Sequence, residues 1–392
     1  MEAIRPGTAP TLPQRARAAA EPAPGAPLEK VHLNGLLPLE TPKDAVETLV
    51  EGYGYAEFPQ CSPDGKRIVF NVVGDYDTSQ MLIMNADGSD VRSLFSGRPL
   101  SADSVQGWLK TNKGKTDEQG SWSSDGRAIY YRSNEKGTFG IAKFDLGNRK
   151  VAMIVHDPAL NMKHPGETHD GWIVGYGGPP GKQFKTSEEY SDIFLANPAD
   201  GSYRLITHSD GSVAYKHPSL IHGMVVAHRE PRGGTETKSD LVQIDPRDGS
   251  EINLTKTPDA DEKHPFYNDK VGLLTFHSDE SGDKNIWIST PDTTRRVQLT
   301  FYGRAAQSPG WSPDGSTIYF VKKLERQAEG EPFFARQADI RAVDVKKALK
   351  DLAKQAKARW QDLRDRGSED AAVSQARKSY EDYKYFLSRY DK

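Results

Sequence analysis

Cysteine is almost absent from this 392-residue sequence, and the single Cys61 cannot form a disulfide within the chain. No stretch is long and apolar enough to be interpreted as a transmembrane helix, and the first residues lack the apolar core of a secretory signal peptide. The 52 Lys and Arg residues nearly balance the 55 Asp and Glu residues, so the net charge is only −3. This balance gives no whole-chain basic signal for nucleic acid, and we expect neither a nucleic-acid partner nor a membrane partner.

The signatures of several common enzyme classes are also missing. There is no Gly-x-Ser-x-Gly elbow of a serine hydrolase, no P-loop and no dinucleotide-binding fingerprint. Residues that favour turns are abundant, with 35 Gly and 25 Pro, while hydrophobic residues make up only 36%. This composition favours many short, half-exposed strands joined by polar turns.

A turn–strand–strand–turn unit recurs along the chain. The clearest copies are 59–65 (PQCSPDG), 121–126 (SWSSDG) and 309–315 (PGWSPDG), each followed by an apolar strand. Three degenerate copies begin at Pro165, Pro218 and Pro265. Six copies spaced by about 44 to 61 residues fit one four-stranded blade per repeat. We therefore predict an all-β fold, a six-bladed β-propeller over residues 44–345.

Both ends of the repeat region have a predicted part. Residues 45–50 match the fourth strand of the other repeats, whereas the last repeat has three strands ending near 339–343, so the N-terminal strand should close the last blade. Residues 1–43 are expected to be a flexible segment. Residues 346–392 have helical periodicity interrupted at Gly367, which predicts two helices that pack on the propeller or, alternatively, mediate contacts with a partner.

One position per repeat, just before the first strand, should face the central channel. Lys-His-Pro occurs at this position three times, at 163–165, 216–218 and 263–265, although the other repeats do without it. We expect the six equivalent side chains to ring one mouth of the channel: Phe58, Gln119, His164, His217, His264 and Ser308. The run 177–189 is predicted to be an insertion that covers one channel mouth.

The histidines of this ring suggest a metal site. Three imidazoles, from His164, His217 and His264, with the amide oxygen of Gln119 would make a first shell for a divalent metal such as Mn, Fe, Zn or Ni. Such a shell leaves positions open for water or substrate. The alternative is that each histidine only hydrogen-bonds a neighbouring blade or channel water.

A second ring is expected from the ends of the second strands: Asn71, Arg132, Tyr176, His228, His277 and Val321. His228 and His277 suit a general base or acid. Arg132 and Arg229 suit bidentate binding of a carboxylate, and Tyr176 is a further candidate catalytic side chain. Each of these residue types, taken alone, is also common in a purely structural place. Other polar residues of the repeats are assigned to turns or to the surface: Asp64, Asp125, Asp314, His169 and His222.

The Ser-Pro-Asp-Gly elements, each followed by a strand pair, resemble the PD40 repeats of TolB-like propellers over roughly residues 45–343. A narrower part, 216–231 with 263–265, is similar to oligogalacturonate lyases, cytoplasmic propeller enzymes that use a divalent metal, commonly manganese, held by histidines and a glutamine. That resemblance implies that His264 is a metal ligand and His228 the catalytic base. The sequence departs from those lyases at 307–309, which lacks their further metal histidines, and in having six predicted blades where they have seven.

Two functions follow as hypotheses. The first is a metal-dependent enzyme, a lyase that performs β-elimination on an acidic (uronate) oligosaccharide; an oxygenase or hydrolase would fit the same metal. The second is a non-catalytic TolB-like propeller that binds a protein or peptide at the channel mouth. The sequence as written predicts a cytoplasmic protein, and a periplasmic protein whose leader has been removed would read the same way.

Overall fold

The structure, a computed structural model, describes residues 38–74, 78–180, 190–232, 238–303, 305–324 and 337–391. The chain divides into two units, Met1–Asn34 and Gly35–Lys392, and the first lies outside the described residues. Most of the predicted flexible segment 1–43 and most of the predicted insertion 177–189 also lie outside them.

Antiparallel sheet dominates the second unit. Four of its sheets are meanders of four strands each. In chain order the first two contain β6 (Asp117–Trp122), β7 (Ala128–Ser133), β8 (Gly140–Asp145) and β9 (Val151–Val155), then β10 (Asn161–Glu167), β11 (Ile173–Gly178), β12 (Asp192–Ala196) and β13 (Tyr203–Leu205). The other two contain β14 (Val213–Ile221), β15 (Met224–Pro231), β16 (Asp240–Ile244) and β17 (Glu251–Asn253), then β18 (Glu262–Asn268), β19 (Leu273–Ser278), β20 (Asn285–Ser289) and β21 (Arg296–Gln298).

The fifth sheet has eight strands and unites the two ends of the repeat region. One half is β2 (Tyr55–Cys61), β3 (Arg67–Val73), β4 (Ser79–Asn85) and β5 (Arg92–Ser93); the other is β22 (Ala306–Trp311), β23 (Thr317–Lys323), β24 (Ala338–Asp344) and β1 (Val46–Val50). A single parallel pairing, Tyr55 with Ala338, joins the halves. The strand β1 pairs antiparallel with β24, as predicted.

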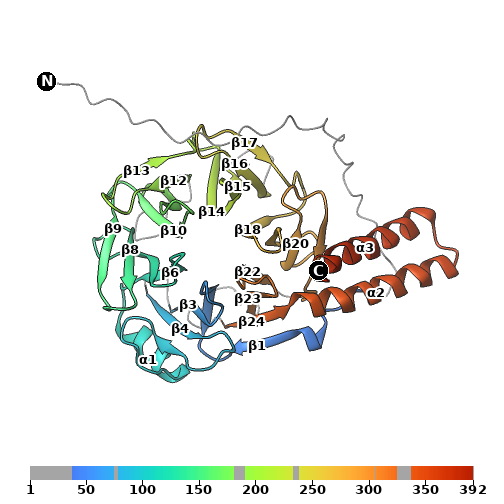
Figure 1. Cartoon of the computed structure of the whole chain (residues 1–392), viewed down its shortest axis with the longest axis horizontal. Helices are drawn as coiled ribbons and strands as arrows, with labels where there is room; N and C mark the ends of the chain where they lie inside the picture. The colour runs from blue at the N-terminus through green and yellow to red at the C-terminus, as the bar shows by residue number, and fades with distance from the viewer. Residues whose placement is uncertain are drawn as a thin grey trace. The chain divides into compact units, whose positions relative to one another are not determined.

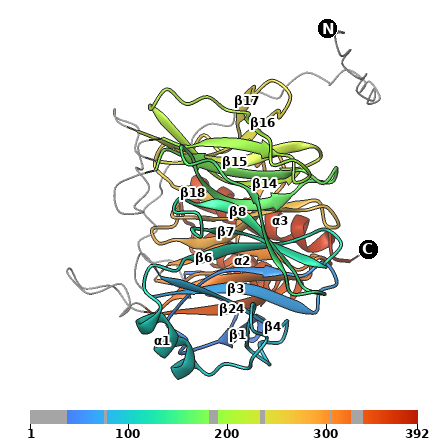
Figure 2. The ribbon, with the colours of Figure 1, turned by 90° about the vertical axis from the view of Figure 1, so that its left-hand side faces the viewer.

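The sheets of this unit stand one after another around a common centre (Figure 1), and Figure 2 shows the ring from its edge; the fold is an all-β propeller. Its first strands, β2, β6, β10, β14, β18 and β22, contact one another across neighbouring sheets. Because the eight-stranded sheet is continuous, the structure does not by itself fix the count of six blades.

The turns between first and second strands carry the repeat chemistry. Ser312 Oγ donates a 2.6 Å hydrogen bond to the Asp314 carboxylate, and the glycine that follows, Gly315, has φ 72°, which a residue without Cβ adopts freely. The tryptophan before this turn reaches the preceding sheet, since Trp311 Nε1 donates to the carbonyl of Phe266 at 3.1 Å. The Ser-Pro-Asp-Gly element therefore forms the turn, and the tryptophan before it joins its sheet to the preceding one.

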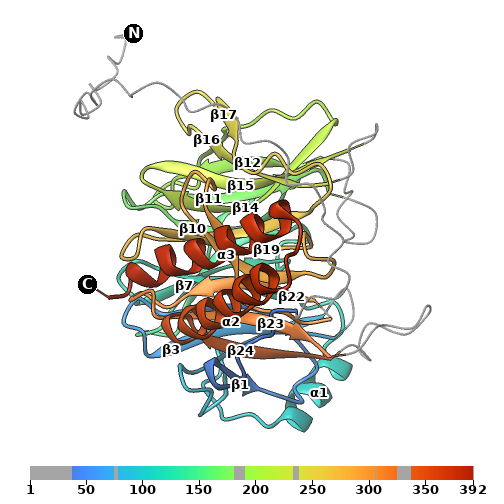
Figure 3. The same cartoon turned by 90° about the vertical axis from the view of Figure 1, so that its right-hand side faces the viewer.

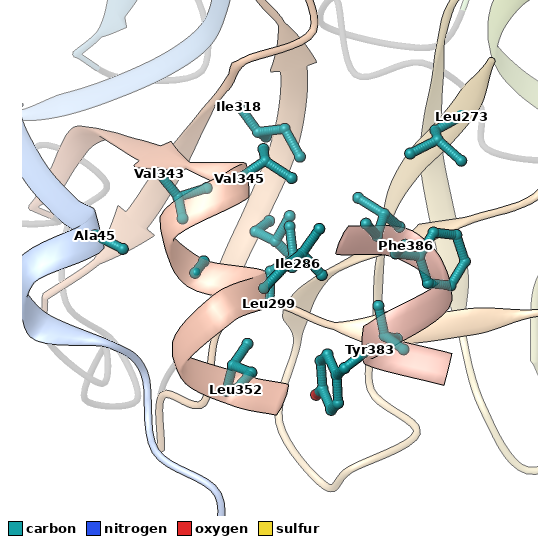
Figure 4. Packing of buried hydrophobic residues seen from close by; sticks show 14 of the residues in the cluster. Ala45, Leu273, Ile286, Leu299, Ile318, Val343, Val345, Leu352, Tyr383 and Phe386 are labelled. Carbon is teal, nitrogen blue, oxygen red and sulfur yellow. The ribbon is translucent and has the colours of Figure 1, made fainter. Parts of the chain in front are cut away.

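Two long helices follow the last strand: α2 (Val345–Asp365) and α3 (Asp370–Ser388), with Gly367 at φ 64° between them. They run side by side along one flank of the ring (Figure 3). Apolar side chains of both helices share one core cluster with strands β19 to β24: Leu273, Ile286, Leu299, Ile318, Val343, Val345, Leu352, Tyr383 and Phe386 (Figure 4).

Two further helical elements are a 3-10 turn, η1 (Lys43–Ala45), and α1 (Ala102–Thr111), which the sequence analysis did not predict. Ser101 caps α1 by accepting from the N–H of Ser104, and Val105 and Leu109, one turn apart, are buried. No helix among the described residues has both the length and the apolar character needed to cross a membrane.

Candidate functional site

The six ring positions lie inside the first strands, not just before them as predicted. Each sits where the register between first and second strand shifts, which is the mark of a β-bulge. All six have a left-handed backbone, with φ between 47° and 57°: Phe58, Gln119, His164, His217, His264 and Ser308. Residues other than glycine seldom adopt this conformation, so its recurrence shows a shared local design.

The three ring histidines lie in mutual contact. The imidazole centroid of His217 is 4.0 Å from that of His164 and 3.6 Å from that of His264. The ring of Phe58 lies 4.5 Å from His164 and closes the cluster on another side. Three side chains from consecutive sheets therefore converge on one place.

Their nitrogens do not point to a common centre in this arrangement. His217 and His264 stack with an angle of 24° between ring planes, and His164 meets His217 edge-on at 69°. In the part of the chain that the structure describes, no three His, Cys, Asp or Glu side chains are placed so as to hold a metal ion.

Side chains of the second predicted ring, which come from the ends of the second strands, face this histidine cluster. His228 is buried with its ring 4.9 Å from His217, and His277 is buried with its ring 5.0 Å from His264. Tyr176 lies 5.3 Å from His217. His228, His277 and Tyr176 are thus brought to the histidine cluster.

Hydrogen bonds between neighbouring sheets hold the two rings in place. Asn71 Oδ1 accepts from the backbone N–H of Gln119, and Gln119 Oε1 accepts from that of His164, each at 3.2 Å. His277 Nδ1 accepts from the backbone N–H of Ser308 at 3.4 Å. The amide oxygen of Gln119 is therefore already engaged in positioning His164.

The cluster has buried nitrogen atoms without hydrogen-bond partners. Within the described residues these include His164 Nε2, His217 Nδ1, His228 Nδ1 and His277 Nε2. Burial, with the nearby positive groups adding to it, lowers the pKa of each of these histidines well below the ordinary value, and lowers the pKa of His264 to about 3. The imidazoles are neutral at pH 7, the state in which histidine binds metals or accepts protons.

Each of the two arginines forms an ion pair with a glutamate of the chain. Arg132 forms an ion pair with Glu118, its cross-strand neighbour, and packs over the ring of Phe139 at 4.3 Å. Arg229 bonds Glu251 on the outermost strand β17 at 2.9 Å. Because neighbouring residues of a strand point to opposite faces, Arg229 faces away from the side that His228 occupies. The binding of a ligand carboxylate by Arg229 stays a prediction, and in this structure the carboxylate that it binds is that of Glu251.

A pocket of about 190 Å³ opens beside the cluster. His217, His228 and His264 line it, together with the lysine of each Lys-His-Pro element: Lys163, Lys216 and Lys263. Sequence reasoning gave these lysines no role, although their threefold recurrence next to the ring histidines was a visible signal.

Glu230 lies among these lysines in the same pocket. Its carboxylate accepts from Lys216 Nζ at 2.6 Å, from Lys263 Nζ at 2.8 Å and from Arg232 at 2.6 Å. Burial alone would raise the pKa of Glu230, but the two lysine charges outweigh it and lower the pKa to about 2. Glu230 is therefore a carboxylate at any physiological pH.

The residues predicted to lie outside the site do so. His169 and His222 are exposed, and His222 Nε2 is 2.8 Å from the hydroxyl of Tyr267. Asp64 and Asp125 accept hydrogen bonds from Ser62 and Ser123 within their turns, as Asp314 does.

The chain is similar in fold to known propellers. TolB from Acinetobacter baumannii superposes with a TM-score of 0.50 at 15% sequence identity, covering 71% of this chain and 64% of that one. An oligogalacturonate lyase in complex with manganese superposes with a TM-score of 0.50 at 12% identity, covering 76% of this chain and 92% of that one. The chain thus spans just under two thirds of the TolB protein that it matches.

An oligogalacturonate lyase from Vibrio parahaemolyticus has a TM-score of 0.49 at 17% identity, over 73% of this chain and 76% of that one. No protein-family model matches the chain, and no curated protein matches it significantly. The predicted likeness to TolB, and the weaker one to oligogalacturonate lyases, is confirmed at the level of a shared propeller fold.

Proposed function

We propose that this chain is a metal-dependent lyase that performs β-elimination on an acidic (uronate) oligosaccharide, at the histidine cluster of a six-bladed propeller. The count of six assigns one blade to each half of the eight-stranded sheet. One observation carries the proposal: five histidines from three sheets gather beside a pocket, and several of their buried nitrogens have no partner among the described residues.

The donor chemistry fits a divalent metal. Neutral imidazole nitrogens are preferred ligands of Mn, Fe, Zn and Ni. A buried nitrogen without a partner destabilises the folded protein, and binding of a ligand to that nitrogen removes the cost. His164, His217 and His264 would hold the ion, with the Gln119 amide as a fourth candidate ligand. When bound, the metal would supply the positive charge that draws in the uronate carboxylate and makes its α-proton more acidic.

His228 would be the base of the elimination. Its burial keeps the imidazole neutral, and the Nδ1 lone pair is free of any partner among the described residues, so that it can accept the α-proton. The electrons of that C–H bond form the new double bond, the glycosidic C–O bond at the β-carbon breaks, and the departing oxygen takes a proton from solvent.

His277 would act as a hydrogen-bond donor. Because its Nδ1 accepts from the N–H of Ser308, a neutral ring carries its hydrogen on Nε2, an atom without a partner in the described chain. An Nε2–H of this kind suits an oxygen of the substrate. Tyr176, whose ring stacks beside His164 at 5.7 Å, would shape the wall on which the sugar lies.

The alternative function is a binding propeller without catalysis, which docks a protein or peptide at the channel mouth. The stacked imidazoles favour it, because their rings contact one another instead of presenting nitrogens to one point. In that case the histidines would be a packing and recognition surface.

Elemental analysis of purified, desalted protein tests the proposal. The comparison is with a triple variant, His164→Ala, His217→Ala and His264→Ala, and with the control His169→Ala, which removes an exposed histidine outside the cluster. We expect near-stoichiometric Mn, Fe, Zn or Ni in the unaltered protein and in the control, and its loss in the triple variant. Absence of metal from all three proteins, even after supplementation, would leave the binding propeller as the function.

A further inference from the structure

We propose that Lys216 and Lys263 form a carboxylate-binding subsite that Glu230 occupies in the ligand-free protein, and that a sugar-acid ligand binds by displacing Glu230. The proposal rests on the proposed function only in taking this pocket as the ligand site. It requires neither a bound metal nor turnover.

The geometry around Glu230 is that of a bound carboxylate ligand. One carboxylate oxygen accepts from Lys216 Nζ at 2.6 Å, and the other accepts from Lys263 Nζ at 2.8 Å. The two lysines come from the first strands of neighbouring sheets, β14 and β18, whereas Glu230 is near the end of β15. A carboxylate is thus clamped between two sheets by charged donors, which is a strong arrangement for binding an anion.

The position of Glu230 suits reversible occupancy. Its side chain remains 17% exposed, and those of Lys216 and Lys263 remain 18% and 20% exposed, so all three have access to solvent. Glu230 is the last residue but one of β15, where a side chain can turn outward without disturbing the ladder. A ligand carboxylate can replace the hydrogen bonds that Glu230 accepts from the two lysines, and Glu230 can keep the one that it accepts from Arg232.

The pocket has an excess of positive charge. Three lysines and one glutamate line it, which gives a formal charge of +2 when the histidines are neutral. The lysines belong to the three consecutive first strands β10, β14 and β18, whereas the equivalent positions of β2 and β6 are Glu57 and Glu118. At this first-strand position, lysine is therefore found in the three sheets that supply the histidine cluster, and its charge draws anions to that side of the mouth.

The size and lining of the pocket indicate the class of ligand. A volume of about 190 Å³ is below the roughly 300 Å³ at which drug-sized pockets begin, and it accommodates one small acid. His217 and His228, which also line it, each have a buried Nδ1 without a partner among the described residues. Lysines clamp the carboxylate while imidazoles face the rest of the molecule, an arrangement that suits a hydroxylated acid such as a uronic acid.

Isothermal titration calorimetry on the whole protein in the presence of a chelator tests the subsite. Three probes are titrated: galacturonate, its neutral counterpart galactose, and inorganic phosphate. We expect galacturonate to bind, galactose to bind at least tenfold more weakly, and phosphate to bind more weakly than galacturonate. Equal binding of galactose would overturn the proposal, and tighter binding of phosphate would overturn the assignment to a carboxylate. This comparison uses the unaltered protein and stays decisive if a variant fails to fold.

Variants test the exchange with Glu230. Lys216→Met and Lys263→Met should each weaken galacturonate binding at least tenfold, whereas Lys110→Met, which removes an exposed lysine on α1, should leave it unchanged. Glu230→Gln should strengthen binding several-fold because the built-in competitor is gone; weaker binding in this variant would overturn the exchange. Metal is chelated throughout these titrations. If galacturonate does not bind, although elemental analysis finds stoichiometric metal, the carboxylate subsite is overturned and the metal site is not. If galacturonate binds, but elemental analysis finds no metal, the proposed metal-dependent lyase is overturned and the subsite is not.

Discussion

The backbone N–H of Ser308 donates to Nδ1 of His277 at 3.4 Å, across the boundary between the sheets that carry β22 and β19. The equivalent bond between the first two repeats joins the N–H of Gln119 to Oδ1 of Asn71 at 3.2 Å. A second-ring side chain thus satisfies the backbone of the first-ring residue in the next sheet. The same atoms that shape the candidate site also join the sheets to each other.

This relationship predicts unequal effects of two substitutions at His277. His277→Leu leaves the buried N–H of Ser308 without an acceptor and should cost about 1–3 kcal/mol of the free energy of unfolding. His277→Asn should cost clearly less, because at the equivalent position in the first repeat the Oδ1 of an asparagine, Asn71, accepts from the backbone N–H of Gln119. Urea unfolding of the two variants measures the difference. Equal destabilisation would show that the contact contributes nothing to stability.

The left-handed backbone of the ring predicts an unusual response to glycine. At Ser308, with φ 53°, a residue with a Cβ is strained by about 1–2 kcal/mol, and glycine is not. Ser308→Gly should therefore have a free energy of unfolding about 1 kcal/mol higher than that of Ser308→Ala, and should unfold at a higher urea concentration. This difference already includes the greater entropy of glycine in the unfolded chain, which partly offsets the relief of strain. A glycine variant less stable than the alanine variant would contradict the bulge geometry.

The repeat made much of this architecture predictable from sequence. Ser-Pro-Asp-Gly marks a turn by local chemistry, so strands, ring positions and the pairing of residues 45–50 with the last strand followed from spacing alone. The helix α1 was missed although its signals were local: Ser101 as a cap, then Val105 and Leu109 one turn apart.

The sequence repeat does not predict which residues the charged side chains pair with. The sequence predicts a ligand for Arg132 and Arg229, but Arg132 pairs with Glu118 on the adjacent strand β6, and Arg229 pairs with Glu251 on β17, two strands away. Which carboxylate an arginine meets depends on cross-strand register, and the bulges shift that register by one residue. The lysines of Lys-His-Pro come directly before these bulges, opposite Tyr176, His228 and His277 of the second strands.

The single thiol offers a test by pH. Burial raises the pKa of Cys61 to about 11, and the hydrogen bond with Tyr319 only partly offsets this effect. Since the thiolate is the reactive form, iodoacetamide should label Cys61 slowly at pH 7.5 and about tenfold faster for each unit of pH up to about 11. Tyr319→Phe removes the offsetting bond and should slow labelling further at pH 7.5. A rate that levels off near pH 8.5 would contradict this assignment.

The last prediction concerns the helices on the flank of the ring. Phe386 of α3 is fully buried in the cluster that contains Ile286 and Leu299, so the helix contributes to the core of the strands and is not only attached to them (Figure 4). Phe386→Ala should cost about 3–5 kcal/mol, while Lys384→Ala, an exposed position on the same helix, should cost less than about 0.5 kcal/mol. Thermal and urea unfolding measure both. If Phe386→Ala left the melting of the whole protein unchanged and only the helices unfolded early, α2 and α3 would be an appendage whose unfolding is uncoupled from that of the propeller.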